Sequence, residues 1–144
     1  MNKKNLIKAV EHLLTVPKER FNIREFRLDY EGKNADKTNP ICETVGCGAG
    51  HLTAIIPQEQ IIYNMAGTID FFSTTLRYLR LNMFRWDYLF SQFWENFDNS
   101  LYGICQRIIY LIKNNKIPSD YFDCSHYNTI NVEAELVEIK KSIQ

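Results

Sequence analysis

The clearest structural signal in this chain is an apolar helical face that begins at residue 101. Asp98, Asn99 and Ser100 precede it, and side chains of these types cap the free amides at the start of a helix. Lys113 and Lys116 follow it, near the negative pole of the predicted helix. Between these ends the apolar positions recur at helical spacing, at Leu101, Ile104, Cys105, Ile108, Leu111 and Ile112. The pattern predicts a buried helix over three turns, with Cys105 as a small core residue.

The same spacing recurs elsewhere in the chain. It is found in residues 5–15 (Leu6, Ile7, Val10, Leu13, Leu14), about 69–82 (Phe72, Leu76, Leu79, Met83), 84–94 (Trp86, Leu89, Phe90, Phe93) and 132–143 (Leu136, Ile139, Ile143). His12 falls on the polar side of the first of these helices, where we expect a solvated side chain. The sequence therefore predicts a mainly α fold, a compact single-domain bundle of about five helices over residues 1–144. Partial alternation of apolar residues at 21–30 favours a short strand or extended strap there.

Composition excludes some classes of function. The chain has 144 residues with 17 basic and 17 acidic side chains, so its formal net charge is zero. Binding of nucleic acid through phosphates requires a basic excess, so nucleic acid is not an expected partner. The charge balance and the lack of a run of about 20 apolar residues also argue against a membrane. No secretory pattern is present at the N-terminus, so we expect a cytoplasmic protein whose four cysteines are free thiols.

A stretch rich in glycine and cysteine, Cys42–Leu52, is the most unusual part of the sequence. It holds two of the four cysteines and three of the six glycines. We expect a helix over about residues 43–55, in which Gly46, Gly50 and Ala54 form a face of small residues. Such a face favours either close helix packing in the core or the close approach of a ligand. A phosphate loop is excluded, because His51 and Leu52 follow the last glycine where lysine and Ser or Thr are required.

The same stretch contains candidate metal ligands and a candidate nucleophile. Cys47 and His51 are four residues apart and share a helical face, and Cys124 and His126 could complete a zinc site. The sequence lacks a Cys-x-x-Cys pair, so we expect no metal and no cofactor. Cys42 at a helix start favours a thiolate, but His51 lies more than two turns away and cannot act as its base. We therefore expect no catalytic residue.

The chain resembles a group of small, poorly characterised proteins of bacteria and phages. The likeness rests on a core motif, Cys-Gly-Thr-x-x-Cys-x-x-Gly followed by His or Trp and then Ala, and on two later blocks. The matching residues are Cys42, Thr44, Cys47, Gly50 and His51, then Trp86, Leu89 and Phe90, and finally Arg107, Ile108, Tyr110, Leu111 and Pro118. Glu43 and Leu52 depart from the motif. The resemblance implies the helical layout and an origin in a mobile element, and it implies no mechanism.

Three functions follow as expectations. The first is an interaction protein that binds a host or phage protein, with a counter-defence inhibitor as one form. A phage-encoded protein of this kind would act in the cytoplasm of the bacterial host. The second is binding of a small anionic ligand such as a nucleotide. Its candidate ligand-binding residues are Cys42, Thr44, Cys47, His51, Arg77 and Arg107. The third is a cysteine- or zinc-dependent enzyme. The partner and the oligomeric state stay open.

Overall fold

The computed structural model describes residues 1–21 and 48–143, and this part of the chain is mainly α, as predicted. Its α-helices are α1 (Lys3–Leu13), α2 (Gly48–Leu52), α3 (Phe71–Leu79), α4 (Met83–Phe90), α5 (Leu101–Asn114) and α6 (Val132–Ile143). Short 3-10 helices are η1 (Lys18–Arg20), η2 (Thr53–Ile55), η3 (Gln58–Gln60), η4 (Gln92–Asn96) and η5 (Cys124–His126). An isolated antiparallel bridge pairs Tyr63 with Ile69.

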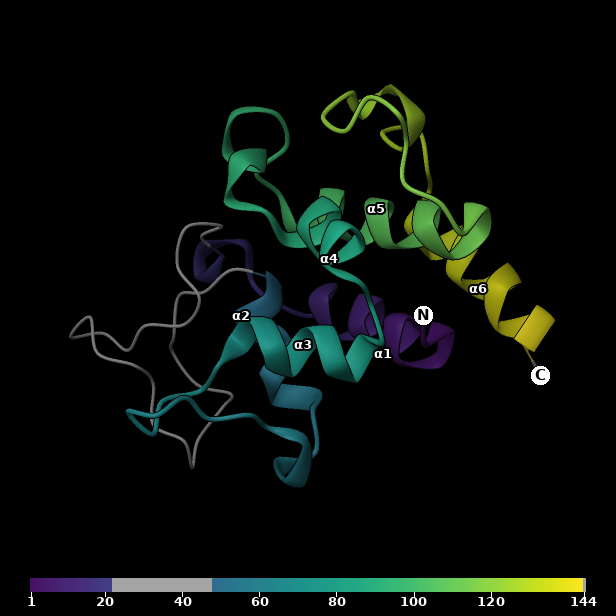
Figure 1. The fold of residues 1–144 in the computed structure, drawn as a ribbon. Coiled ribbons are helices and arrows are strands. Elements are labelled where there is room, and N and C mark those ends of the chain that lie inside the picture. Colours follow the sequence, from purple (N-terminus) through teal and green to yellow (C-terminus); the bar gives the residue numbers. More distant parts are fainter. Residues whose placement is uncertain (22–47, 144) are drawn as a thin grey trace.

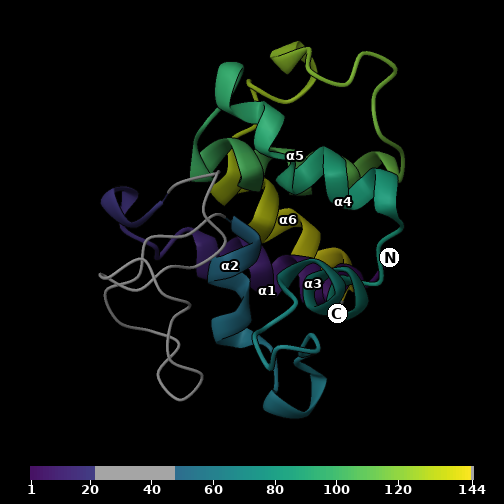
Figure 2. The same ribbon diagram turned by 60° about the vertical axis from the view of Figure 1, so that its left-hand side comes forward.

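The helices are arranged around α5. This helix packs against α1, α4 and α6, while α1 also contacts α2 and α3. Figure 1 shows α4 and α5 on one side and α1, α2 and α3 on the other, with α6 running beside α5 to the C-terminus. The view in Figure 2 shows α2 and α3 lying next to α1. Within the described residues, no helix combines the length and the apolar character that a membrane crossing requires.

Polar side chains fix where the helices begin. Asn2, Asp70, Asn82 and Ser100 each accept a hydrogen bond from the backbone amide three residues later, over 2.9–3.2 Å. These caps satisfy amides that have no partner inside the helix. The predicted start at Ser100 is therefore confirmed.

The core confirms most of the predicted apolar faces. In α5 every predicted position is buried, and in α1 and α6 the same is true of Leu6, Ile7, Val10, Leu13, Leu136 and Ile139. Cys105 is fully buried, and burial raises the pKa of its thiol to about 12. Leu14 differs from the prediction, since it lies just past the end of α1 and is partly exposed.

Two predicted helices are interrupted, and each break moves a predicted core residue to the surface. Arg80 adopts a left-handed conformation with φ of 51°, which ends α3 and leaves Met83 67% exposed at the start of α4. Ser91 turns the chain out of helical geometry after α4, with ψ of 137°. The predicted core position of Phe93 is therefore wrong, because this residue is 61% exposed and its neighbour Trp94 is fully buried.

Of the predicted face of small residues, Gly50 is buried, Ala54 is half-buried and Gly46 lies outside the described residues. Gly48, Ala49 and Gly50 are all buried in α2. A Cβ added to Gly48 would lie 2.7 Å from Cδ1 of Ile104 and 3.4 Å from the ring of Phe90, so a larger side chain here would require the end of the Ile104 side chain to move. The predicted α-helix to residue 55 is shorter, because η2 replaces its last turn. Residues 43–47, and 22–30 of the predicted strand, lie outside the described part of the chain.

Candidate functional site

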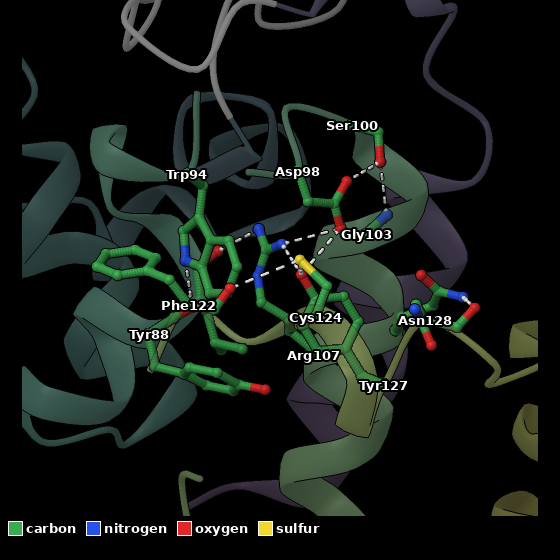
Figure 3. Close-up of polar contacts among 12 residues, drawn as sticks. Tyr88, Trp94, Asp98, Ser100, Gly103, Arg107, Phe122, Cys124, Tyr127 and Asn128 are labelled. Atoms are coloured by element: carbon green, nitrogen blue, oxygen red, sulfur yellow. Dashed lines mark hydrogen bonds and ion pairs between the residues drawn. The ribbon is translucent and has the colours of Figure 1, made fainter. Parts of the chain in front are cut away.

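A fully buried arginine occupies the contact between α4 and α5. The apolar face of α5 includes Arg107, whose side chain has no solvent exposure. One guanidinium nitrogen, Nη2, donates to the backbone carbonyl of Leu89 in the last turn of α4 over 3.2 Å. The guanidinium also lies over the ring of Trp94, with Cζ 4.0 Å from the ring centroid. A desolvated cation–π contact of this kind contributes about 2 kcal/mol. Arg107 therefore holds the end of α4 and the following turn against α5 (Figure 3).

Asp98 and Tyr127 complete the surroundings of the arginine. Nη1 of Arg107 lies 3.4 Å from Asp98 Oδ2 and 3.4 Å from the Tyr127 hydroxyl. Burial lowers the pKa of Arg107, while Tyr127 and Asp98 act in the opposite direction and favour the charged form. The Tyr127 hydroxyl lies 3.1 Å from both Asp98 Oδ2 and Cys124 Sγ, so its single proton can be donated to one of them at a time.

Local sequence explains how Asp98 reaches this position. It lies two residues before the start of α5 and accepts a 2.6 Å hydrogen bond from the hydroxyl of Ser100, which caps the helix. Its carboxylate rests where a Cβ of residue 103 would be, so the ion pair depends on glycine at that position. Three residues near the start of α5, Asp98, Ser100 and Gly103, thus act together (Figure 3).

Trp94 is the centre of an aromatic cluster. Its indole nitrogen donates to the backbone carbonyl of Tyr88 over 2.8 Å, so the one polar atom of this buried side chain has a hydrogen-bond partner. Its ring contacts four others, with centroid distances of 5.0–6.4 Å to Tyr88, Tyr121, Phe122 and Tyr127. Edge-to-face pairs at such distances contribute about 0.5–1.5 kcal/mol beyond burial. The loop before α6 is therefore fixed against α4 and η4.

The outer side of this cluster carries two exposed phenylalanines and two half-buried aromatic rings. We define the aromatic surface as Phe84, Phe97, Tyr121 and Phe122. Phe97 stacks on Phe122 with a centroid distance of 4.8 Å, and Phe122 contacts Tyr121 at 5.0 Å. The Tyr121 hydroxyl lies 3.3 Å from the backbone carbonyl of Phe84. Phe84 and Phe97 are 73% and 55% exposed, values that are high for phenylalanine in a folded domain.

The charged residues nearest to the aromatic surface are mainly acidic. Asp87 accepts a hydrogen bond of 2.8 Å from Tyr121, and Asp120 and Asp123 flank Tyr121 and Phe122 in the chain. All three aspartates are exposed. Burial and the bond to Asp87 raise the pKa of Tyr121, which therefore stays protonated as a donor. The nearby cation, Arg85, donates to Asn115 over 2.7 Å. Three exposed aspartates therefore lie next to the aromatic surface in the chain, together with one cation, Arg85, beside Phe84.

Not every buried polar atom near Arg107 is satisfied. Within the described part of the chain, the Tyr88 hydroxyl, Arg107 Nε and His126 Nε2 are buried and have no hydrogen-bond partner. A partly satisfied polar network stabilises a core no better than apolar residues of similar size. Stability alone therefore does not account for a charged residue at position 107.

The predicted ligand-binding residues are found in different places. Cys42, Thr44 and Cys47 lie outside the described residues. Arg77 is exposed on α3, whereas Arg107 is enclosed as described above. Their assignment as ligands stays a prediction, and binding through Arg107 would require its buried contacts to open.

His51 joins three segments of the chain. Its Nε2 lies 2.7 Å from the carbonyl of Arg20 in η1, and its own carbonyl accepts a 3.0 Å hydrogen bond from His12 in α1. The expectation of a solvated His12 is therefore wrong, because the ring is half-buried against α2. Burial lowers the pKa of His12 from its ordinary value.

The two C-terminal residues that could have completed a zinc site, Cys124 and His126, have other contacts. Cys124 is half-buried beside Tyr127, and His126 lies 4.0 Å from Asp123. Among the described residues, no three His, Cys, Asp or Glu side chains gather as a metal site would require.

Sequence reasoning missed Asp98, Trp94 and Tyr127 as partners of Arg107. The sequence contains one signal for this site, because Arg107 falls on the apolar face that Cys105, Ile108 and Leu111 belong to. A charge at such a position requires a partner, but the pattern does not say which residue supplies it.

Comparisons with known proteins return no match: no family model fits the chain, and neither the curated proteins nor the solved structures contain a significant relative.

Proposed function

We propose that the protein acts by binding a partner protein through the aromatic surface. The observation that carries this proposal is the exposure of Phe84 and Phe97 on a rigid base. Burying a phenylalanine side chain contributes about 1.5–3 kcal/mol, so aromatic side chains held in place are effective anchors for a partner. Phe93, which is 61% exposed on η4, adds a third apolar side chain close to Trp94 in the chain.

The buried network supplies the rigidity that this function requires. Arg107 holds the end of α4 and η4, and Trp94 holds the loop that carries Tyr121 and Phe122. Side chains fixed in this way lose little conformational entropy on binding. The buried polar atoms near Arg107 that lack hydrogen-bond partners fit this interpretation. They reduce stability, and a network that serves to position a surface can retain them.

The charges around the aromatic surface indicate the chemistry of the partner. Asp87, Asp120 and Asp123 favour a partner segment with apolar side chains and a positive charge. A host or phage protein with such a segment would fit the expectation of a small protein from a mobile element, and counter-defence inhibition is one role within this proposal. Its location in the bacterial cytoplasm is part of the same proposal.

Affinity capture with matched variants tests this function. The wild-type protein, the double variant Phe84→Ser/Phe97→Ser and the control Val137→Ser would be used as bait in a bacterial lysate. Val137 is 51% exposed on α6 and is not part of the aromatic surface. We expect a partner that wild type and control retain and that the double variant loses. Binding should then be reproduced with purified proteins and weaken as salt increases.

Two results would contradict the proposal. One is a purified partner that binds the double variant as tightly as the wild-type protein. The other is native mass spectrometry that shows association only between copies of this chain, with the association lost in Phe84→Ser/Phe97→Ser.

A further inference from the structure

A cavity lies between the end of α1 and the start of α5. Its volume is about 350 Å³, which is within the range of small-molecule sites. Leu13 and Val16 from the end of α1, Phe21 after η1, and Leu101 at the start of α5 form its apolar wall. One water molecule occupies ~30 Å³ in the liquid. If each non-hydrogen atom of a ligand needs the same volume, the cavity holds about a dozen of them.

One charged side chain lines this cavity. Lys18 is exposed in η1 and forms no ion pair with any described residue, so its ammonium group is available to a ligand. None of the described residues that line the cavity is acidic. Two carboxylates are next to lining residues in the sequence: Glu19, which is exposed and follows Lys18, and Asp98, which is paired with Arg107 and bonded to Ser100. The partial positive charge at the start of α5 adds to that of Lys18.

We propose that this cavity binds an amphipathic small molecule with an unbranched apolar chain and a single carboxylate head. The apolar wall takes the chain, and the carboxylate lies against Lys18. An exposed lysine with no partner in the described chain favours one negative charge. Asn99, Ser100 and Tyr102 also line the cavity, but the hydroxyls of Ser100 and Tyr102 are already hydrogen-bonded to Asp98 and Glu133, so the apolar side chains of the wall favour a hydrocarbon chain. This site is separate from the aromatic surface and does not depend on the function proposed for it.

Decanoate, with twelve non-hydrogen atoms, is the probe that matches the cavity in size and charge. Binding to the full-length protein would be measured by calorimetry and by backbone amide shifts, below the micelle concentration of the probe. Decanol and acetate test the head and the chain separately. We expect decanoate to bind with one molecule per chain, to shift the amides of residues 13–16, 18 and 101–102, and to bind more tightly than either analogue.

Substitutions at the cavity then identify the contacts. Lys18→Gln should weaken decanoate binding about fivefold, as loss of one exposed charge pair does, and Lys8→Gln on the exposed side of α1 should have no effect. Val16→Trp should fill the cavity and remove binding. If that variant does not fold by circular dichroism, Leu14→Trp at the exposed edge of the cavity replaces it. Val137→Trp on α6 serves as the control for an added indole.

Several outcomes would overturn the proposal. They are the absence of decanoate binding, shifts that map elsewhere, or unchanged binding in a folded Val16→Trp or Leu14→Trp variant. Equal affinity for decanol, together with no effect of Lys18→Gln, would refute the carboxylate head. Dimer formation with shifts at the cavity would show that a second copy of the chain occupies it instead.

Discussion

Replacement of Gly103 by alanine should destabilise this protein, although the same change usually stabilises a helix. Alanine is favoured over glycine inside helices by about 0.5–1 kcal/mol. Gly103 lies in the first turn of α5, where an added Cβ would overlap the carboxylate of Asp98. The side chain of Asp98 would therefore have to leave its position beside Arg107.

The structure gives the size of the effect. Asp98 would lose the 3.4 Å ion pair with Arg107 and its contacts with Tyr127 and Ser100, at 3.1 and 2.6 Å. Removing one partner of a buried ion pair costs about 3–5 kcal/mol. The lower end applies here, because Asp98 is 19% exposed and Arg107 keeps its contacts with Leu89 and Trp94. After the helix gain is subtracted, Gly103→Ala should reduce the free energy of unfolding by about 2 kcal/mol.

A double-mutant cycle separates the two effects. Urea unfolding followed by tryptophan fluorescence would be measured for the wild type, Gly103→Ala, Asp98→Ala and the double variant. In the Asp98→Ala background the carboxylate is absent, so Gly103→Ala should be neutral or stabilising by up to about 1 kcal/mol. A loss of about 2 kcal/mol in both backgrounds, or stabilisation in the wild type, would refute the reasoning.

Three further predictions concern other parts of the structure. Gly48→Val should reduce the free energy of unfolding by about 2 kcal/mol, because its side chain would meet Ile104 and Phe90 and overpacking usually costs ~1–3 kcal/mol. A change below about 0.5 kcal/mol in urea unfolding would contradict this. Burial lowers the pKa of His12 below its ordinary value of 6.5. At a pH below 6.5 the unfolded chain therefore binds more protons than the folded chain, and the free energy of unfolding should fall as the pH drops from 6.5 toward the pKa of the folded state. His12→Gln should flatten this dependence, and identical pH curves would count against the assignment. Iodoacetamide at pH 8 should leave Cys105 unmodified until urea unfolds the protein, because the pKa of its thiol is raised to about 12. Peptide mass spectrometry identifies the labelled site, and equally fast labelling of the native protein would exclude the burial described.

Predictions from apolar spacing were reliable in α5, less accurate in α3, where Phe72 and Leu76 are half-buried while Thr74 and Thr75 are buried, and wrong beyond the end of α4. The face of α5 is buried at every predicted position, and α6 has the predicted bounds of residues 132–143. Phe93 was assigned to the core because it continues the spacing of Trp86, Leu89 and Phe90. Ser91 breaks the helix between them, so the angular relation no longer holds and Trp94 takes the buried position.

The candidate sites were less predictable than the fold. The aromatic surface joins α4, η4 and residues 121–122, and the cavity joins α1 to α5. Neither set forms a motif in the sequence, because its members belong to elements that meet only after folding. Motif reasoning instead selected residues 42–51, most of which lie outside the described part of the chain.

The amino-acid sequence by itself determined the helical class, the cap at Ser100 and the buried face of α5, because these depend on neighbours within a few residues. The tertiary structure decided what surrounds Arg107. A buried charge requires partners from every side, and here they come from Leu89, Trp94, Asp98 and Tyr127, on four different segments. Helical periodicity places Arg107 on the inner face of α5, but only the packing of α4, η4 and the loop before α6 brings the compensating groups within reach of its guanidinium.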